Sequence, residues 1–563
     1  MTFDSSLEVR CERLGPLPLV NHFLDRLGIA ELLDRYVPRS RVHKTLDPTR
    51  ALGVLLRSIL VEREPIYRQQ ETVRGFLPSA FGLEADEISR LSDDAVGRAL
   101  DRLFDADRAA MLTDLVVGIR KRFGVKCDEV HNDSTSIKLT GQYAKARGRS
   151  VRGKRVPWIT YGYSKDHRPD LKQLLFILTT SSDGGIPVQF RSGDGNASDA
   201  KSHIETWEAL FQVVGSPDFL YVADSKLCTS ENMDYIDRKR GRFVTVLPRS
   251  RAEDAEFRQW VQTNEPPWEE VWDRPNPRRR AGPRDVWKAF KYPLPSREAW
   301  PVIWVVSSLL ALAQERSRRD RLARATQELG ALKKKLEGPR RRTRARVIQK
   351  VEKILSKRHV ERYLKVTVSE TTEQKFTQEH PGRRGPDTLY RRKDRRHLTL
   401  SWELDEARIA YDRKSDGMYP LLTNDRVLTP AQVLDAHKRQ PTIEKRFEQA
   451  KTVFEIAPIL LKNEGRIEAL FFLYFVALLA QALIERELRR AMKRDGIEEL
   501  PLYPEERRSR RPTSEQVLRL FSSMERYKIF RRADLVQVCE PELTALQKQV
   551  LTLLGVPLEK YRN

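Results

Sequence analysis

The sequence predicts an α/β protein of several domains, organised around a mixed β-sheet. Up to about residue 125 the apolar residues recur with helical spacing, and from about residue 126 short β-branched runs alternate with helical segments. A long basic segment then interrupts this pattern at 251–400. With 563 residues the chain is also too long for one simple core.

Residues 1–125 are expected to form an all-α domain. Its helical segments begin at LPLVNHFLDRLGIAELLDRYV, PTRALGVLLRSILVE and SDDAVGRALDRLF. Ser92 is a suitable N-cap, because Asp93 and Asp94 follow it in the first turn. Such a domain could be a scaffold, bind a specific DNA sequence or dimerise, and composition does not decide between these.

Residues 126–250 are expected to form the first part of a catalytic core. Strands are predicted at 129–138, 172–180, 186–191, 218–224 and 242–247, with helices at 200–213 and 229–239. Three strands joined by hairpins, then helix, strand, helix, strand, is the order of an RNase H-like mixed sheet. In that order Asp133 lies on the first strand and Asp224 ends the fourth, its neighbour in the sheet.

Residues 251–400 are expected to be an insertion made of strands and a helical hairpin. Apolar residues at alternating spacings of three and four form a seam for another helix: Leu322, Ala325, Leu329, Leu332 and Leu336. A helix at 344–358 is a candidate partner, and strands at 363–369 and 398–404 are expected to return to the main sheet. Cation clusters at 278–280, 333–335, 340–346 and 391–396 are either solvated faces or, as we favour, DNA contacts.

Residues 401–499 are expected to complete the core, beginning with a strand-rich return over RIAYDRKSDGMYPLLTND (408–425). A helix over QPTIEKRFEQAK (440–451) would place Glu444, Phe447 and Lys451 on one face. The apolar run ALFFLYFVALLA at 469–480 is too short to span a bilayer and is typical of a buried core helix. Residues 500–563 are predicted to be a helical tail.

The charge of the chain points to a polyanionic partner. The formal net charge is +24 and the sequence pI is about 9.8. We favour nucleic acid over the alternative of a basic protein that is merely soluble. Four scattered cysteines predict neither a disulfide framework nor a zinc site, and no secretory signal precedes the first helix, so we expect a reducing, cytoplasmic setting without a membrane.

Three acids are the candidate catalytic residues. Asp133, Asp224 and Glu444 come from separate elements that one sheet could bring together. Cutting or joining a phosphodiester is assisted by two Mg²⁺ ions about 4 Å apart, held by carboxylates. For any one of them a surface carboxylate or N-cap remains the simpler reading, and only the combination of contexts favours a metal site.

The sequence resembles the DDE transposases of bacterial insertion sequences, in the IS-four-like group. The resemblance covers nearly the whole chain and is carried by LGPLPLVNHFLDRLGI, PIYR, NDSTSIKLTG, YGYSKDHRPDLKQ, GDGNASD, VADSK, DGMYPLLTND and IEKRFEQAK. YGYSKDHRPDLKQ is the most specific of these segments. The group has a Tyr, Arg, Glu, Lys signature, in which Glu444 and Lys451 match, while His437 and Gln440 stand at the Tyr and Arg positions.

The resemblance implies an enzyme that binds the terminal inverted repeats of an element, cleaves DNA and joins the freed 3′ hydroxyl to target DNA. It implies two Mg²⁺ ions, replaceable by Mn²⁺, at Asp133, Asp224 and Glu444, and a homodimer on paired ends in the bacterial nucleoid. Lys451 would contact a phosphate, with Lys438 or Arg439 replacing the missing Arg, and Asn132, Lys165, Asp170 and Asp199 could support the site. Similar enzymes form a DNA hairpin and stack a flipped base on an aromatic ring, for which the candidates are Trp268, Trp272 and Trp300. For each of them we slightly favour the alternative of a core residue.

Two other functions stay open. One is a decayed or domesticated relative that binds DNA without catalysis, which the presence of all three acids disfavours. The other is a structure-selective nuclease, which would cleave DNA but never join it.

Overall fold

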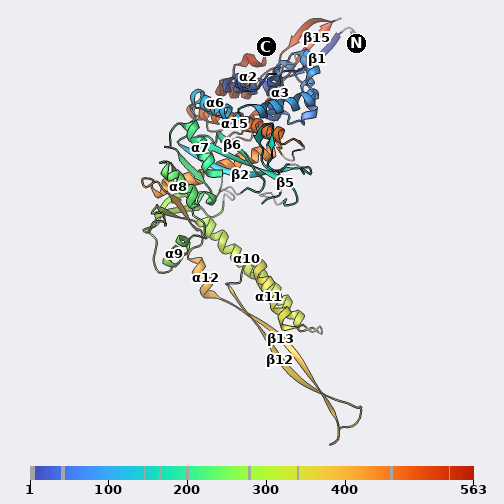
Figure 1. The fold of residues 1–563 in the computed structure, drawn as a ribbon, viewed down its shortest axis with the longest axis vertical. Helices are drawn as coiled ribbons and strands as arrows, with labels where there is room; N and C mark the ends of the chain where they lie inside the picture. The colour runs from blue at the N-terminus through green and yellow to red at the C-terminus, as the bar shows by residue number, and fades with distance from the viewer. Residues whose placement is uncertain are drawn as a thin grey trace. The chain divides into compact units, whose positions relative to one another are not determined.

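The computed structural model describes residues 7–39, 45–144, 146–163, 168–197, 202–276, 281–338, 342–456, 459, 461–531 and 533–562. The chain divides into two compact units (Figure 1). The first combines residues 1–245 with 435–563, and the second comprises residues 246–434. We describe each unit by itself.

The sheet of the first unit has five strands, β2 (Glu129–Leu139), β5 (Lys172–Ser181), β6 (Pro187–Gly193), β7 (Leu220–Ala223) and β8 (Arg242–Val246). Their order is β6-β5-β2-β7-β8. β2, β5 and β6 are antiparallel, whereas β7 pairs parallel to β2 and β8 pairs parallel to β7. The α/β fold class and the RNase H-like strand order are therefore confirmed. Two short strands, β3 (Ser150–Val151) and β4 (Lys154–Arg155), form a separate hairpin.

Helices cover both faces of this sheet. On one face α15 (Glu464–Arg494) packs its Phe471 and Phe475 against Phe176 of β5 and Phe190 of β6. On the other face His203 of α7 (His203–Val214) bonds the Tyr221 hydroxyl of β7. α8 (Ser230–Arg238) makes the crossover from β7 to β8. The two crossover helices thus lie close to their predicted ranges.

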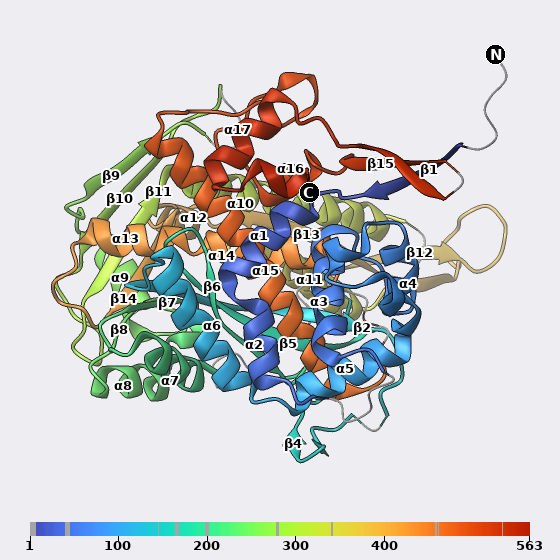
Figure 2. The ribbon, with the colours of Figure 1, turned by 90° about the horizontal axis from the view of Figure 1, so that it is seen from above.

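Helix α15 is also the axis around which the N-terminal helices pack (Figure 2). These are α1 (Leu17–Leu27), α2 (Ile29–Tyr36), α3 (Pro48–Val61), α4 (Gln69–Arg74), α5 (Asp93–Asp105) and α6 (Arg108–Phe123). Ser92 caps α5 as predicted, accepting from the Ala95 amide at 3.2 Å. α15 has the length and composition of a membrane span, but 89% of its most apolar window is buried inside the protein, as in a core helix.

Both ends of the chain contain strands where only helices were predicted. β1 (Leu7–Arg13) pairs antiparallel with β15 (Glu525–Arg531), which pairs with β16 (Asp534–Cys539). The C-terminal helices are α16 (Ser514–Arg519) and α17 (Ala545–Leu554). Because most side chains of β1 and β16 are exposed, these strands lack the apolar runs by which the others were recognised.

The second unit contains four antiparallel strands and a helical hairpin. The strands are ordered β14 (Met418–Thr423), β11 (Val302–Ser307), β10 (Asp285–Lys291), β9 (Glu269–Arg274), and α9 (Ala252–Trp260) precedes them. α10 (Ser308–Leu336) buries Ala325, Leu329 and Leu332 against Val347 and Val351 of α11 (Arg344–Arg358). The predicted seam is confirmed, and its partner is the helix that follows it in the same chain.

The last elements of this unit correct two predictions. β12 (Leu364–Gln378) and β13 (Tyr390–Leu404) do not return to the main sheet, because they pair only with each other as a two-stranded ribbon. Residues 408–413, expected as strand, belong to α12 (Glu406–Arg413), which Asp405 caps by accepting from the Arg408 amide at 3.1 Å.

Candidate active site

Asp133 lies on β2, and Asp224 directly follows the end of β7, the parallel neighbour of β2. β2 and β7 pair with Glu129 opposite Leu220 and His131 opposite Val222, an offset of 91 residues. Continued for two residues past this pairing, the same offset would bring Asp224 level with Asp133, on the face that carries Glu129 and His131. Adjacent strands are about 4.8 Å apart, so this register would allow the two carboxylates to share a ligand.

Backbone amides hold both carboxylates in place. Asp133 Oδ1 accepts from the Ser134 amide at 2.7 Å, and Asp224 Oδ1 accepts from the Lys226 amide at 3.0 Å. The Asp224 carbonyl also accepts from the Thr245 hydroxyl at 2.6 Å. Both aspartates are half-buried, so solvent or a ligand reaches them while their geometry is restrained.

The segment with Glu444 is anchored to β2 through Gln440. After α13 (Pro430–Arg439) the chain enters α14 (Pro441–Glu448), with Gln440 between them in helical conformation. Gln440 Nε2 donates to the Asn132 carbonyl at 2.9 Å, and its Oε1 lies 2.9 Å from His131 Nδ1. Gln440, at the position where the signature has Arg, therefore binds the strand that carries Asp133.

A charge network at the edge of the sheet, formed by the half-buried Glu129, the buried His131 and the exposed Arg439, extends this anchor. Glu129 accepts from both Nε and Nη2 of Arg439 at 2.6 Å, and its Oε1 lies 2.8 Å from His131 Nε2. Burial raises the pKa of Glu129, but the bonds from His131 and Arg439 outweigh it and lower the pKa to about 2. In this structure the Arg439 guanidinium thus neutralises Glu129 and pins the end of α13 to β2.

A second anchor fixes the far side of α14. Arg446 is 1% exposed and donates to the Gly185 and Gly184 carbonyls at 2.8 and 2.9 Å, in the turn between β5 and β6. It also bonds Gln449 Oε1 at 2.6 Å and Glu485 of α15 at 3.0 Å. The side chain of Arg446 therefore connects the β5–β6 turn, α14 and α15.

Glu444 and Lys451 lie on this anchored segment. Glu444 is exposed, one helical turn beyond Gln440, whereas Lys451 is half-buried in the π-helical segment Gln449–Val453. Within the described ranges, no three His, Cys, Asp or Glu side chains are grouped closely enough to hold a metal ion. The oxygen donors of Asp133 and Asp224 fit Mg²⁺, and Glu444 does not complete a cluster with them in this conformation.

The remaining predicted residues lie in varied surroundings. Burial, then Lys438 and His131, lowers the pKa of His437 to about 4, so the ring is neutral near pH 7. Trp300 is 6% exposed and belongs to the core of the second unit. Trp268 and Trp272 are half-buried, Trp268 against Phe290 and Trp272 beneath the Arg274 guanidinium. Lys165, Asp199 and the cluster 278–280 lie outside the described residues.

Sequence reasoning missed Glu129, His131 and Arg446, which position α14. The polar run EVHNDSTS gave one signal, because polar residues persist along a strand that is buried in a sheet. Nothing in the sequence indicates the partners that these side chains find about 300 residues away.

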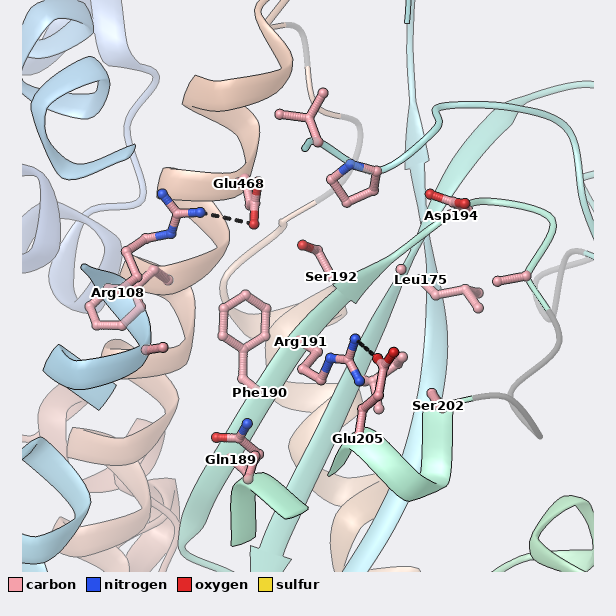
Figure 3. A pocket seen from close by; sticks show the side chains of 18 of the residues that line it. Arg108, Leu175, Gln189, Phe190, Arg191, Ser192, Asp194, Ser202, Glu205 and Glu468 are labelled. Atoms are coloured by element: carbon pink, nitrogen blue, oxygen red, sulfur yellow. Dashed lines mark hydrogen bonds and ion pairs between the residues drawn. The ribbon is translucent and has the colours of Figure 1, made fainter. Parts of the chain in front are cut away.

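A well-formed cavity of the first unit is separate from the carboxylates. It has a volume of about 640 Å³ and lies between α6, β6, α7 and α15, and neither Asp133, Asp224 nor Glu444 lines it. Its charged side chains face each other in pairs, Arg108 with Glu468 at 3.0 Å and Arg191 with Glu205 (Figure 3). Since these charges are already compensated, the cavity has no excess charge with which to attract an ionic ligand.

Comparison with known proteins finds a family model and solved structures that are similar to this chain. Residues 9–117 match a family model described as "Domain of unknown function (DUF4277)". No curated protein matches the sequence at a significant level. Among solved structures the chain is similar to "Cryo-EM structure of piggyBac transposase synaptic complex with hairpin DNA (SNHP)", with 11% identity and a TM-score of 0.24 over 54% of this chain and 63% of that chain. At that TM-score the similarity supports no conclusion about fold or function. The family model covers the N-terminal helical region of the first unit.

Proposed function

We propose that this protein is a DDE transposase of the insertion-sequence type, which binds element ends and catalyses DNA strand cleavage and strand transfer. The observation that supports this most directly is the parallel pairing of β2, which carries Asp133, with β7, which Asp224 follows, in a sheet of RNase H-like strand order. The net charge of +24 supports DNA as the substrate. The segmental resemblance around YGYSKDHRPDLKQ and IEKRFEQAK supplies the reaction class.

Mg²⁺ is the proposed cofactor, with Mn²⁺ as a substitute. Asp133 and Asp224 would hold it, and Glu444 would join them after a shift of its side chain or helix on binding DNA. When bound, two such ions stabilise charge on the attacking and leaving oxygens of a phosphodiester. The chain's own contribution is positional, because amides orient both aspartates while Gln440 and Arg446 hold the helix of Glu444 over the same strand.

The proposed handling of DNA assigns further residues. Lys451 follows Glu444 by two helical turns and would contact a phosphate near the scissile bond. His437 and Gln440 would adjust the helix to the DNA end. If a hairpin forms, Trp268 and Trp272, which are half-buried, are better candidates than the buried Trp300 for stacking on a flipped base. A homodimer on paired inverted repeats in the bacterial cytoplasm completes the proposal.

The test is cleavage and joining of a duplex that carries the element's own end, with Mg²⁺. Asp133→Asn, Asp224→Asn and Glu444→Gln keep the size of each side chain and remove its charge. We expect each to reduce cleavage by at least about a hundredfold while end binding in gel shifts survives, because metal ligands act on the reaction and not on docking. Asp128→Asn, at an exposed residue just before β2, is the matched control and should stay active.

Other outcomes separate the alternatives. Binding without cleavage by the wild type indicates a DNA-binding relative that has lost catalysis. Cleaved ends without joined products indicate a structure-selective nuclease. An active Glu444→Gln variant means that the third carboxylate lies elsewhere in the chain.

A further inference from the structure

The ribbon of β12 and β13 has an outer part that contributes nothing to any core. Near its base Leu364, Val368 and Leu400 join the apolar cluster of α10 and α11. Leu398 also packs against this cluster. From Ser369 of β12 to His397 of β13 no side chain of either strand is buried, and the ribbon runs on beyond the helical hairpin of its unit (Figure 1). A free two-stranded ribbon is marginally stable in water, so packing does not explain this length.

The two faces of this outer part differ in how their charges are compensated. On one face Arg392 pairs with Asp394 at 2.8 Å and Arg396 pairs with Glu370 at 3.6 Å. On the other face the side-chain alternation collects four exposed cations, which we call the cationic face: Lys375, Arg391, Lys393 and Arg395. Glu373 lies on the same face, directly opposite Arg395, and its Oε2 is 3.1 Å from His397 Nε2. None of the ion pairs found among the described residues involves any of these four.

The register makes the cationic face unfavourable without a partner. Lys375 of β12 is directly opposite Lys393 of β13. Like charges directly opposite on antiparallel strands destabilise the pair. A polyanion bound along the cationic face would compensate this repulsion. A neutral partner would leave the repulsion unchanged, and a cationic partner would increase it.

The dimensions of the ribbon select the kind of polyanion. Arg391, Lys393 and Arg395 alternate along one strand, so they extend over about 14 Å at about 3.4 Å per residue. The major groove of B-DNA is about 12 Å wide and admits a two-stranded β-ribbon. We propose that the β12–β13 ribbon inserts its cationic face into the major groove of duplex DNA, with Lys375, Arg391, Lys393 and Arg395 reaching phosphates and base edges.

The inference rests on DNA as the partner of the proposed function, but not on catalysis. It is tested with full-length protein and a fluorescent duplex of about 40 base pairs. The variant replaces Lys375, Arg391, Lys393 and Arg395 with Gln. The matched control replaces four exposed cations of α10 and α11, Arg316, Arg319, Lys350 and Lys353, with Gln, so both proteins lose the same charge.

Two readouts are required. Each phosphate contact contributes about 0.9 to the magnitude of the slope of log K against log salt concentration. The ribbon variant loses up to four contacts, so the magnitude of its slope should fall by up to about 3.6. The control should keep a slope near that of the wild type. Dimethyl sulfate methylates guanine N7 in the major groove, so wild type and control should protect N7 positions that the ribbon variant leaves reactive. Thermal unfolding should be the same for all three proteins, because none of the replaced side chains is buried.

Three results overturn the proposal. Equal slopes for variant and control exclude DNA contact by the cationic face. A reduced slope without N7 protection in the wild type places the ribbon on the backbone outside the groove. If the variant instead alters self-association in sedimentation and leaves the slope unchanged, the ribbon binds protein. Failure of strand cleavage by the wild type would refute the proposed function and leave this inference intact.

Discussion

Replacing Glu129 by Gln tests whether the charge network under α13 and α14 holds the helix of Glu444 in place. The side chain of Glu129 is 13% exposed and its pKa is lowered from 4.5 to about 2, a difference of about 2.5 units. At about 1.4 kcal/mol per unit, the ionised carboxylate stabilises the folded state by about 3 kcal/mol at pH 7. Glu129→Gln keeps the shape of the side chain and removes this contribution.

The sign of the pH dependence follows from the lowered pKa. The stabilisation is fully present above pH 4.5, where the carboxylate is ionised in both folded and unfolded chains, and is lost as the pH falls toward 2. The difference between wild type and variant should therefore shrink from about 3 kcal/mol at pH 7 to about 1 kcal/mol at pH 3. Hydrogen exchange of the backbone amides in residues 440–447 measures this difference in stability locally.

The control for this experiment is Asp128→Asn, which removes the same charge from an exposed neighbour. It should leave the exchange rates near those of the wild type at both pH values. Equal protection in Glu129→Gln and Asp128→Asn would refute the reasoning, as would a difference that does not change with pH.

Three further variants probe the two units. Arg446→Met removes the nearer cation of the buried Glu485, which keeps Arg489 at 3.4 Å, and should cost about 3 kcal/mol in urea unfolding. Much of this loss should be recovered when Glu485→Leu is added; no recovery would mean that the bonds to the Gly184 and Gly185 carbonyls dominate. Leu329→Ala, at a fully buried seam position, should lower stability by about 2–5 kcal/mol, whereas Leu312→Ala, 48% exposed on the same helix, should change it little. Gly417 and Gly496 both have positive φ, so alanine is strained at either position. A Cβ at Gly417 would lie 2.6 Å from the Ser307 carbonyl oxygen, whereas a Cβ at Gly496 would have no heavy atom within 4 Å. Gly417→Ala should therefore lower the melting temperature more than Gly496→Ala. A larger effect at Gly496 would contradict the steric argument.

The sheet of the first unit was predictable because its strands carry the appropriate patterns. β5 is a nearly continuous buried run, KQLLFILTTS, and β7 is LYVA, both typical of strands covered on two faces. The hairpins and helices between such runs then restrict the strand order to few possibilities. The approach of Asp133 to Asp224 followed from that order alone.

Other features depend on partners that lie far away in the sequence. The segments VTVS and LTLSW at the base of the ribbon have sequences that predict strands. The outer segments SETTEQKFTQ and RRKDRRH have no alternation of buried and exposed residues, and they form strands because they pair with each other. β1 and β15 pair across more than 500 residues. The position of Gln440 against His131 likewise depends on the packing of α14, which periodicity does not specify.

The split of the first unit around residues 246–434 has a consequence for the newly made chain. Glu444 is synthesised 311 residues after Asp133. At roughly 5–20 residues per second the interval is on the order of 15–60 s. Asp224 is made 91 residues after Asp133, so for the remaining 220 residues the ribosome holds a chain that has both aspartates and lacks the third proposed carboxylate. Truncated products of interrupted translation would therefore lack Glu444, together with the anchors that Gln440 and Arg446 provide.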